Sequence, residues 1–141
     1  DEYREQVRPG EYRTITSRPR DRKLLPAGQI NSSLGELITS YERQTEIERN
    51  HILDFHVRFE EIFPFEDGNG RVGRLILFKE CLRHDIMPFI IDDKRRGAYN
   101  RGITQWDKTP DVLQNVVCEA QKRFQSKMET FRLMQYHRPP K

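Results

Sequence analysis

The residues best suited to chemistry lie in one short run, Asp67-Gly68-Asn69-Gly70-Arg71-Val72-Gly73-Arg74. An aspartate precedes two glycines, and two arginines follow at a spacing of three residues. Glycines ahead of a helix let a phosphate approach backbone N–H groups, and the helix dipole reinforces their positive charge. Arginine binds phosphate oxygens bidentately, and a carboxylate together with phosphates is a typical ligand set for Mg²⁺. The run therefore predicts a site for a polyphosphate with Mg²⁺, in which Asp67 holds the metal.

Each part of this run has a structural interpretation when it is taken alone. A Gly-Asn-Gly sequence is common in tight turns, two spaced arginines often lie on a solvated helix face, and Asp67 can cap a helix. Asn69 can hydrogen-bond a phosphate or hold the loop. The combination of all these residues between two apolar helical patterns favours the anion site.

A group-transfer site also needs a base or a nucleophile, and none is found at the expected place. Phe63 occupies it, immediately before Pro64. A phenyl ring neither accepts nor donates a proton, and loss of a positioned general base costs about 10²–10⁴ in rate. We interpret His56, two helical turns earlier, as a histidine that packs between helices and holds the loop by hydrogen bonds. The other histidines show no metal-ligand spacing apart from a weak Cys81-x-x-His84, so we expect no zinc site.

The apolar spacing predicts five helices that must position these residues. Apolar residues recur at steps of three and four over about 34–41, 45–62, 72–82, 99–106 and 113–131. We expect the first helix to be capped by Asn31-Ser32-Ser33, the second to end before Pro64, and the third to begin at Gly70 or Arg71. Short connections between five helices indicate an all-α domain.

The N-terminal segment is less regular. Residues 1–31 carry proline and glycine, and Glu11–Thr16 is rich in strand-forming residues. This stretch could form a short β-hairpin with the region around Lys23–Leu25. An exposed hairpin edge could accept a peptide by strand addition.

Composition limits the class of protein. The chain has 141 residues, enough for one domain, with 35% hydrophobic and 33% charged residues and a net charge of +3. No stretch has the length and apolarity of a membrane span. Much of the positive charge lies in the N-terminal arm without aromatic interleaving, so we expect a solvated arm or an anionic-ligand rim and no nucleic-acid partner. We predict that Cys81 and Cys118 are buried free thiols in a cytoplasmic protein.

The run from Phe63 to Arg74 resembles the signature of the Fic family, His-Pro-Phe-x-(Asp/Glu)-Gly-Asn-Gly-Arg-x-x-Arg. Every defined position matches except the first, where Phe63 replaces histidine. Gly10-x-Tyr12-Arg13 resembles the segment before the family's core, His56-x-x-Phe59-Glu60 resembles its preceding helix, and Tyr99 resembles its later tyrosine. The resemblance implies a Fic-type helical bundle with a short β-hairpin flap near the N-terminus. It divides the chain into an extension at 1–9, a Fic domain at 10–132 and a tail at 133–141.

The resemblance further implies transfer of AMP from ATP to a hydroxyl side chain of a target protein, with Mg²⁺ held by Asp67. The residues that match the family's phosphate site are Gly68, Asn69, Gly70, Arg71 and Arg74. The flap that docks the target corresponds to the region of Tyr12, Arg13, Leu24 and Leu25. Because Phe63 replaces the base, we expect ATP and Mg²⁺ binding with little or no AMP transfer. Phe63 is explained equally by natural loss of the base and by a substitution made to inactivate the protein. The alternative is a catalytically dead nucleotide-binding or protein-interaction module of the same fold.

Regulation and source also follow from the resemblance only. The family's inhibitory pattern, (Ser/Thr)-x-x-x-Glu-(Gly/Asn), does not occur in this sequence. An inhibitory helix therefore either has been removed from a longer protein or is supplied in trans by an antitoxin-like protein. The resemblance suggests a bacterial, toxin-like protein.

Overall fold

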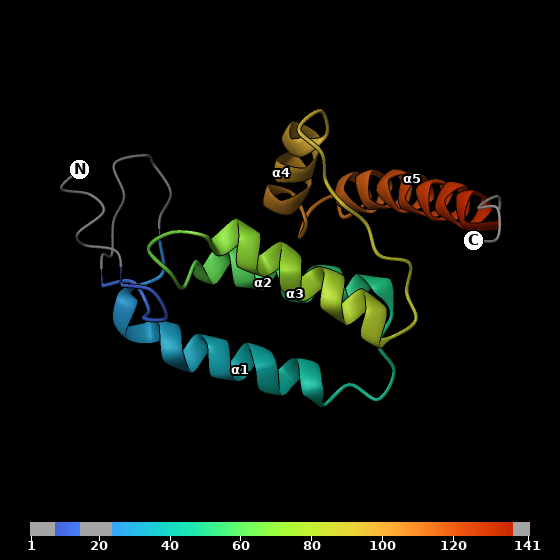
Figure 1. The fold of residues 1–141 in the computed structure, drawn as a ribbon. Coiled ribbons are helices and arrows are strands. Elements are labelled where there is room, and N and C mark those ends of the chain that lie inside the picture. The colour runs from blue at the N-terminus through green and yellow to red at the C-terminus, as the bar shows by residue number, and fades with distance from the viewer. Residues whose placement is uncertain (1–7, 15–23, 137–141) are drawn as a thin grey trace. The chain divides into compact units, whose positions relative to one another are not determined.

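The computed structural model describes residues 8–14 and 24–136, and this part of the chain is helical (Figure 1). A 3-10 turn, η1 (Ala27–Gln29), precedes five α-helices. They are α1 (Ile30–Glu42), α2 (Arg49–Ile62), α3 (Asn69–Arg83), α4 (Arg96–Thr104) and α5 (Asp111–Tyr136). The predicted all-α fold is confirmed for the described residues.

The predicted hairpin flap is not supported. No strand occurs in the described residues on either side of it, 8–14 and 24–26, and its middle, 15–23, lies outside the described part of the chain. The backbone N–H of Arg13 donates to Pro64 O at 2.8 Å. The segment around Arg13 is thus attached to the end of α2, where its N–H cannot serve a hairpin partner.

Contacts divide the chain into two compact units, Asp1–Glu80 and Cys81–Lys141, each of which has its own packing. The domain limits predicted from the sequence, 1–9, 10–132 and 133–141, remain predictions. The boundary between the two units falls inside α3, near its C-terminal end.

The first unit contains η1, α1, α2 and most of α3. One part of its core is a cluster of Ile30, Leu34, Phe59 and Ile62, against which Phe55, Phe65, Val72 and Ile76 pack with part of their surface. Tyr41 of α1 donates to Glu80 of α3 at 3.0 Å, which links these two helices. Burial of one large apolar side chain contributes about 1.5–3 kcal/mol, so this cluster supplies much of the unit's stability.

The helix starts differ in detail from those expected. α1 begins at Ile30 directly after η1, and Ser32 Oγ donates to Gln29 O at 3.0 Å, so the predicted Asn31–Ser33 cap is wrong. α2 begins at Arg49 with a capping box, in which Glu48 N–H donates to His51 Nδ1 at 2.9 Å. This bond satisfies a backbone donor at the start of the helix and gives His51 a structural role.

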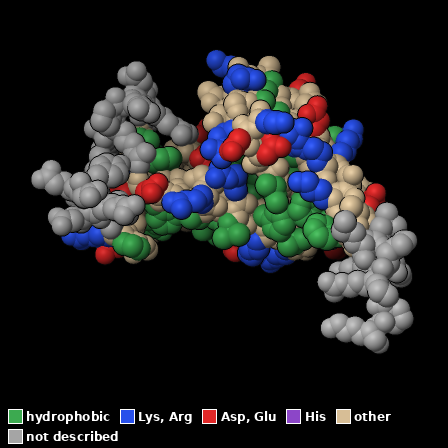
Figure 2. All heavy atoms as spheres, turned by 45° about the horizontal axis from the view of Figure 1, so that its top comes forward, with side chains coloured by type: hydrophobic (Ala, Val, Ile, Leu, Met, Phe, Trp, Pro, Cys, Tyr) green, Lys and Arg blue, Asp and Glu red, His purple; other side chains and the backbone are tan. Residues whose placement is uncertain are grey.

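The second unit contains the end of α3, the connection at 84–95, α4 and α5. α4 and α5 meet at Gly102, where an added Cβ would lie 2.8 Å from Leu113 Cα. Cys81 is buried and Cys118 is partly buried, and both are free thiols. Hydrophobic side chains gather on the face shown in Figure 2, with lysines and arginines along their border. No helix in the described chain is long and apolar enough to cross a membrane.

Candidate functional site

The site begins where α2 ends. Phe63 is the C-cap residue, with φ 50° and ψ 62°, and its N–H donates to Phe59 O at 3.1 Å. This left-handed conformation is unfavourable for a non-glycine residue by roughly 1–2 kcal/mol. It turns the chain sharply out of α2, and Pro64 then prevents the helix from continuing. The position predicted for the missing base therefore lies in a strained turn at the entrance of the loop.

A buried arginine stabilises this turn. Arg13 donates from Nε to Phe63 O at 2.6 Å, and from Nη2 to Leu25 O at 2.6 Å and Ile62 O at 3.2 Å. A cation on the last carbonyls of a helix satisfies acceptors that have no intrahelical donor, and it interacts favourably with the helix dipole. Arg13 thereby fixes the direction in which the chain enters the loop.

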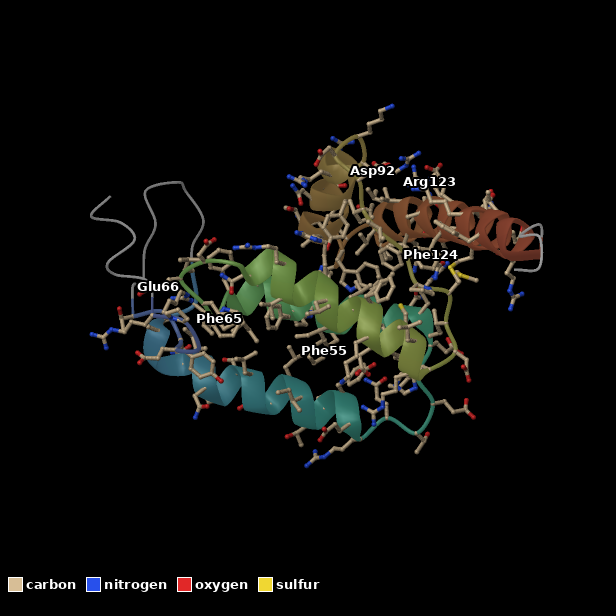
Figure 3. All side chains as sticks on the ribbon, in the orientation of Figure 1. Phe55, Phe65, Glu66, Asp92, Arg123 and Phe124 are labelled. Carbon is tan, nitrogen blue, oxygen red and sulfur yellow. The ribbon has the colours of Figure 1, made fainter. Side chains whose placement is uncertain are left out.

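The loop itself is held by Asn69. Phe65 N–H donates to Asn69 Oδ1 at 2.8 Å, and Asn69 Nδ2 donates to Phe65 O at 2.7 Å. The side chain is buried, so both of its polar ends serve the loop. Of the two roles open to Asn69 from sequence, the structure shows that the side chain holds the loop. Figure 3 shows Phe65 and Glu66 on this loop, next to the start of α3.

Two arginines lie over the glycines at the start of α3. Gly68 has φ 82°, a conformation suited to glycine, and a Cβ there would lie 3.6 Å from Arg71 Nη2. A Cβ on Gly70 would lie 3.0 Å from Arg74 Nη1. Asp67 Oδ1 accepts from Gly68 N–H at 2.7 Å, and Asp67 Oδ2 lies 3.5 Å from Arg71 Nη2. The start of α3 thus carries two guanidinium groups and one carboxylate around the two glycines.

Accessibility and donor chemistry fit an anion with a hard metal ion. The Arg71 and Asp67 side chains are 76% and 69% exposed, so a ligand can reach both. No group of three or more His, Cys, Asp and Glu side chains suited to a metal occurs among the described residues. A lone carboxylate that shares Mg²⁺ with substrate phosphates agrees with the ordinary coordination of this ion.

Behind the loop, α2 and α3 approach closely at Gly73. An added Cβ would lie 2.9 Å from Glu60 Oε1, 3.0 Å from His56 Cε1 and 3.1 Å from Phe59 Cδ1. Burial lowers the pKa of His56 from 6.5 to about 4, aided by the nearby positive charge of Arg74 and opposed by a hydrogen bond with the Gly73 backbone. His56 is therefore neutral at physiological pH and acts in the packing of α2 on α3, next to Arg74.

The model of the Fic/DOC family matches residues 1–81. The chain belongs to this family. The match includes the whole run from Phe63 to Arg74 and the first compact unit. It also accounts for the close agreement between the Fic signature and the loop at the start of α3.

Solved structures with Fic domains have a similar fold. A Fic-domain-containing signalling protein from Bacteroides thetaiotaomicron VPI-5482 has a TM-score of 0.68 and 18% identity, over 84% of this chain and 52% of that one. A fragment of Fic-1 from C. elegans has a TM-score of 0.63 and 18% identity, over 91% of this chain and 38% of that one. The chain thus spans about half or less of each of these proteins. No curated protein matches the sequence at a significant level.

The residues of the Fic signature extend from Phe63, directly after α2, through the loop to Arg74 in α3. Their roles in a binding site stay a prediction. The residues predicted for the docking flap are in different environments. Tyr12 is 43% exposed with its ring 6.1 Å from that of Phe65, whereas Arg13 and Leu24 are buried. Leu25 is partly buried and gives its carbonyl to Arg13. A docking role for this segment stays a prediction.

Two positions in this Fic domain were missed by sequence reasoning. Arg13 was assigned to target docking, and nothing local indicates that its side chain reaches carbonyls 49 and 50 residues away. Gly73 was treated as an unspecified position of the signature. An isolated glycine inside an apolar helical pattern was the available signal, because such a glycine often marks a close approach.

Proposed function

We propose that this chain is the Fic-type core of a protein AMP transferase that binds ATP with Mg²⁺ at the start of α3. Phe63 leaves it without the base for transfer. The observation that carries this proposal is the placement of Arg71 and Arg74 over Gly68 and Gly70. Membership of the Fic/DOC family supports the same assignment, because the family is generally associated with nucleotidyl transfer.

Phosphate binding follows from the local physics. The first N–H groups of an α-helix have no intrahelical acceptor, and the positive end of the helix dipole adds to their attraction for anions. Arg71 and Arg74 supply two further positive charges at the same end. Because Asn69 and Arg13 fix the loop before the ligand arrives, little conformational entropy is lost on binding.

Asp67 is the residue that would hold Mg²⁺ in this site, and bound Mg²⁺ would neutralise part of the phosphate charge. The carboxylate lies beside Arg71 at 3.5 Å, so the two side chains together present both signs of charge. That combination suits an anionic ligand that arrives with a cation. Arg71 and Arg74 would orient the phosphates.

The transfer step explains the importance of residue 63. A target hydroxyl oxygen attacks the α-phosphorus of ATP, the bond to the β-phosphate bridging oxygen breaks, and pyrophosphate leaves. The hydroxyl proton must pass to a base, and the Phe63 ring cannot take it. We expect nucleotide binding to survive, because its donors are backbone groups and arginines, while transfer is slowed by about 10²–10⁴.

The observation of Phe63 also favours a second candidate, a nucleotide-binding module that acts through protein contacts. In either case we propose a cytoplasmic location and a protein partner, with inhibition by a helix from elsewhere in a longer protein or in trans. We favour AMP transfer over transfer of a phosphate group, because this chain keeps Gly70, the second glycine of the Fic signature. A glycine at this position leaves room in the loop for the α-phosphate of ATP.

Calorimetric titration with ATP and Mg²⁺ tests the binding site. We expect saturable heat for the chain as it stands, and affinity at least tenfold lower for Arg71→Ala, since a charge-assisted hydrogen bond contributes about 1.5–3 kcal/mol. Arg83→Ala, at the other end of α3, is the matched control and should bind normally. The assignment is wrong if no heat is seen, or if Arg71→Ala binds as tightly as the control.

Restoring the base distinguishes the two candidates. Phe63→His should attach labelled AMP to the chain itself or to an added target, while the chain with Phe63 attaches little. Phe63→Gln, which cannot act as a base but is polar and similar in size to histidine, is the matched control. Nucleotide binding by Phe63→His without AMP transfer would favour the interaction module.

A further inference from the structure

The second unit contains an apolar cavity that has no part in the proposed nucleotide site. It has a volume of about 290 Å³ and lies between the connection before α4 and one face of α5. Its lining is mainly hydrophobic, with one acidic and two basic side chains: Ile90, Asp92, Ala120, Arg123, Phe124, Lys127, Met128 and Phe131. Figure 3 shows Asp92, Arg123 and Phe124 in this region.

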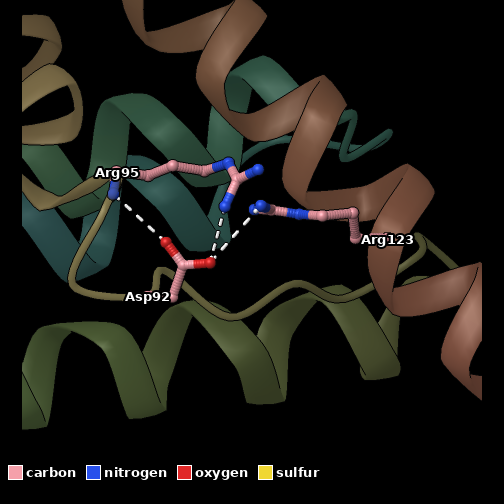
Figure 4. Close-up of polar contacts among 3 residues, drawn as sticks. All are labelled: Asp92, Arg95 and Arg123. Atoms are coloured by element: carbon pink, nitrogen blue, oxygen red, sulfur yellow. Dashed lines mark hydrogen bonds and ion pairs between the residues drawn. The ribbon is translucent and has the colours of Figure 1, made fainter.

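The cavity wall is held in place by hydrogen bonds. Gln121 Nε2 donates to Met87 O at 2.6 Å, which attaches the connection to α5. Asp92 accepts from Arg95 N–H at 3.1 Å and Arg95 Nη1 at 2.6 Å, and Arg123 Nη1 lies 3.4 Å from Asp92 Oδ2 (Figure 4). These bonds give the cavity a defined wall and hold Arg123 at its edge.

The apolar face continues along α5 beyond the buried core. Ala120, Phe124, Met128 and Phe131 recur at steps of four, four and three, which places them on one face of the helix. Ala120 is buried, but Met128 is 50% exposed and Phe131 is 65% exposed. Ile90, on the opposite wall, is 64% exposed. Large apolar side chains that rim a cavity in this way are typical of a protein-binding surface.

The charges at the edge select the kind of partner. Asp92 is shared by two arginines, so the group of Asp92, Arg95 and Arg123 keeps one positive charge, and Lys127 adds another. A second copy of the chain would bring the same positive edge and would be repelled. An acidic segment would be attracted, because charge complementarity guides association and selects partners.

The exposed rim of the cavity argues for side chains of a partner protein over a free small molecule. Small-molecule sites usually enclose about 300–1,000 Å³ and bury most of their ligand. This cavity is at the lower limit of that range, and its outer residues are half-exposed or more, so it would leave much of such a ligand in contact with water. One or two large apolar side chains fit the space, and the rest of a peptide would lie along α5.

We infer that this cavity, with the exposed face of α5, is a docking site for an acidic peptide segment of a partner protein. The large apolar side chains of this peptide segment enter the cavity beside Phe124 and Met128, and the carboxylates of the segment pair with Lys127 and Arg123. The site is independent of the nucleotide loop, so it holds whether or not the proposed AMP transfer is correct.

Fluorescence polarisation with defined peptides tests the proposal. The probe is a labelled helical peptide of leucine, phenylalanine and alanine with glutamates beside the large side chains. The comparison peptide has every glutamate replaced by lysine. We expect saturable binding of the acidic peptide that weakens as salt is raised, and at least tenfold weaker binding of the basic one.

Matched variants of the full chain locate the binding. Lys127→Glu and Met128→Glu should each weaken acidic-peptide binding about tenfold, while Lys122→Glu on the same helix and Leu82→Glu should not. Met128 and Leu82 are 50% and 58% exposed, so both variants should fold. The proposal is overturned if the two peptides bind equally, if neither binds, if all four variants behave alike, or if sedimentation shows a dimer that Met128→Glu dissociates.

Discussion

Acidification should destabilise the domain through His56, the histidine that packs behind the loop between α2 and α3. The pKa of His56 is lowered to about 4 in the folded chain, against 6.5 as its ordinary value. A lowered pKa means that the stability is complete above pH 6.5 and is lost as the pH falls toward 4. The full difference corresponds to about 3 kcal/mol, of which about 2 kcal/mol is lost between pH 7.5 and pH 5. Stopping at pH 5 keeps most carboxylates ionised.

The assay is urea unfolding at a series of pH values for the chain and for His56→Gln, which has no titrating group at this position. The difference in free energy of unfolding between the two should change by about 2 kcal/mol between pH 7.5 and pH 5, since the contributions of distant groups cancel. His84→Gln is the control, because it shows how much the removal of a different imidazole changes the pH dependence of the free energy of unfolding. A difference that stays constant to within about 0.5 kcal/mol would refute a neutral, buried His56.

Three further predictions concern the loop and its supports. Gly73→Ala should lower the free energy of unfolding in urea by about 1–3 kcal/mol, because its Cβ would meet side chains of α2 at 2.9–3.1 Å. The control Gly35→Ala lies in open space on α1 and should raise it by up to about 1 kcal/mol. Equal effects of the two substitutions would contradict the close approach of α2 and α3. Arg13→Ala should cost about 3 kcal/mol by the same measurement, because the buried Arg13 donates to three carbonyls. Arg8→Ala should change nothing measurable, because the ion pair of Arg8 is exposed. Gly68→Ala should weaken ATP binding in calorimetry, because a φ of 82° strains any residue with a Cβ. Unchanged affinity would show that the turn at Gly68 does not belong to the proposed ATP site.

Much of the helical framework was accessible from the sequence. The end of α2 at Ile62 was predicted correctly from Pro64, and α3 begins at Asn69, within one or two residues of the expected start. The faces were predicted less well. Leu75 is 70% exposed and Phe131 is 65% exposed, although both belong to apolar patterns. Periodicity identifies a helix, but it does not show which part of an apolar face has a neighbour to cover it.

The β-hairpin predicted near the N-terminus is a case in which local sequence preference gave the wrong structure. Strand-forming residues around Tyr12 suggested a flap, yet the described residues there are irregular, and Arg13 bonds to the end of α2. Local propensity is a weak guide where one long-range group of hydrogen bonds can fix the backbone. Three carbonyls held by one buried guanidinium outweigh a preference worth about 1 kcal/mol.

The sequence by itself determined the helical class, the order of Asp67, the glycines and the arginines, and the absence of a base at Phe63. These features depend on residue type and on spacing of a few positions, which the chain carries locally. Only the tertiary structure decided that Asn69 holds the loop, that Arg13 stabilises the turn at Phe63, and that Gly73 lets α2 and α3 meet beside His56. Such contacts join residues far apart in the chain, and packing alone determines which of them meet.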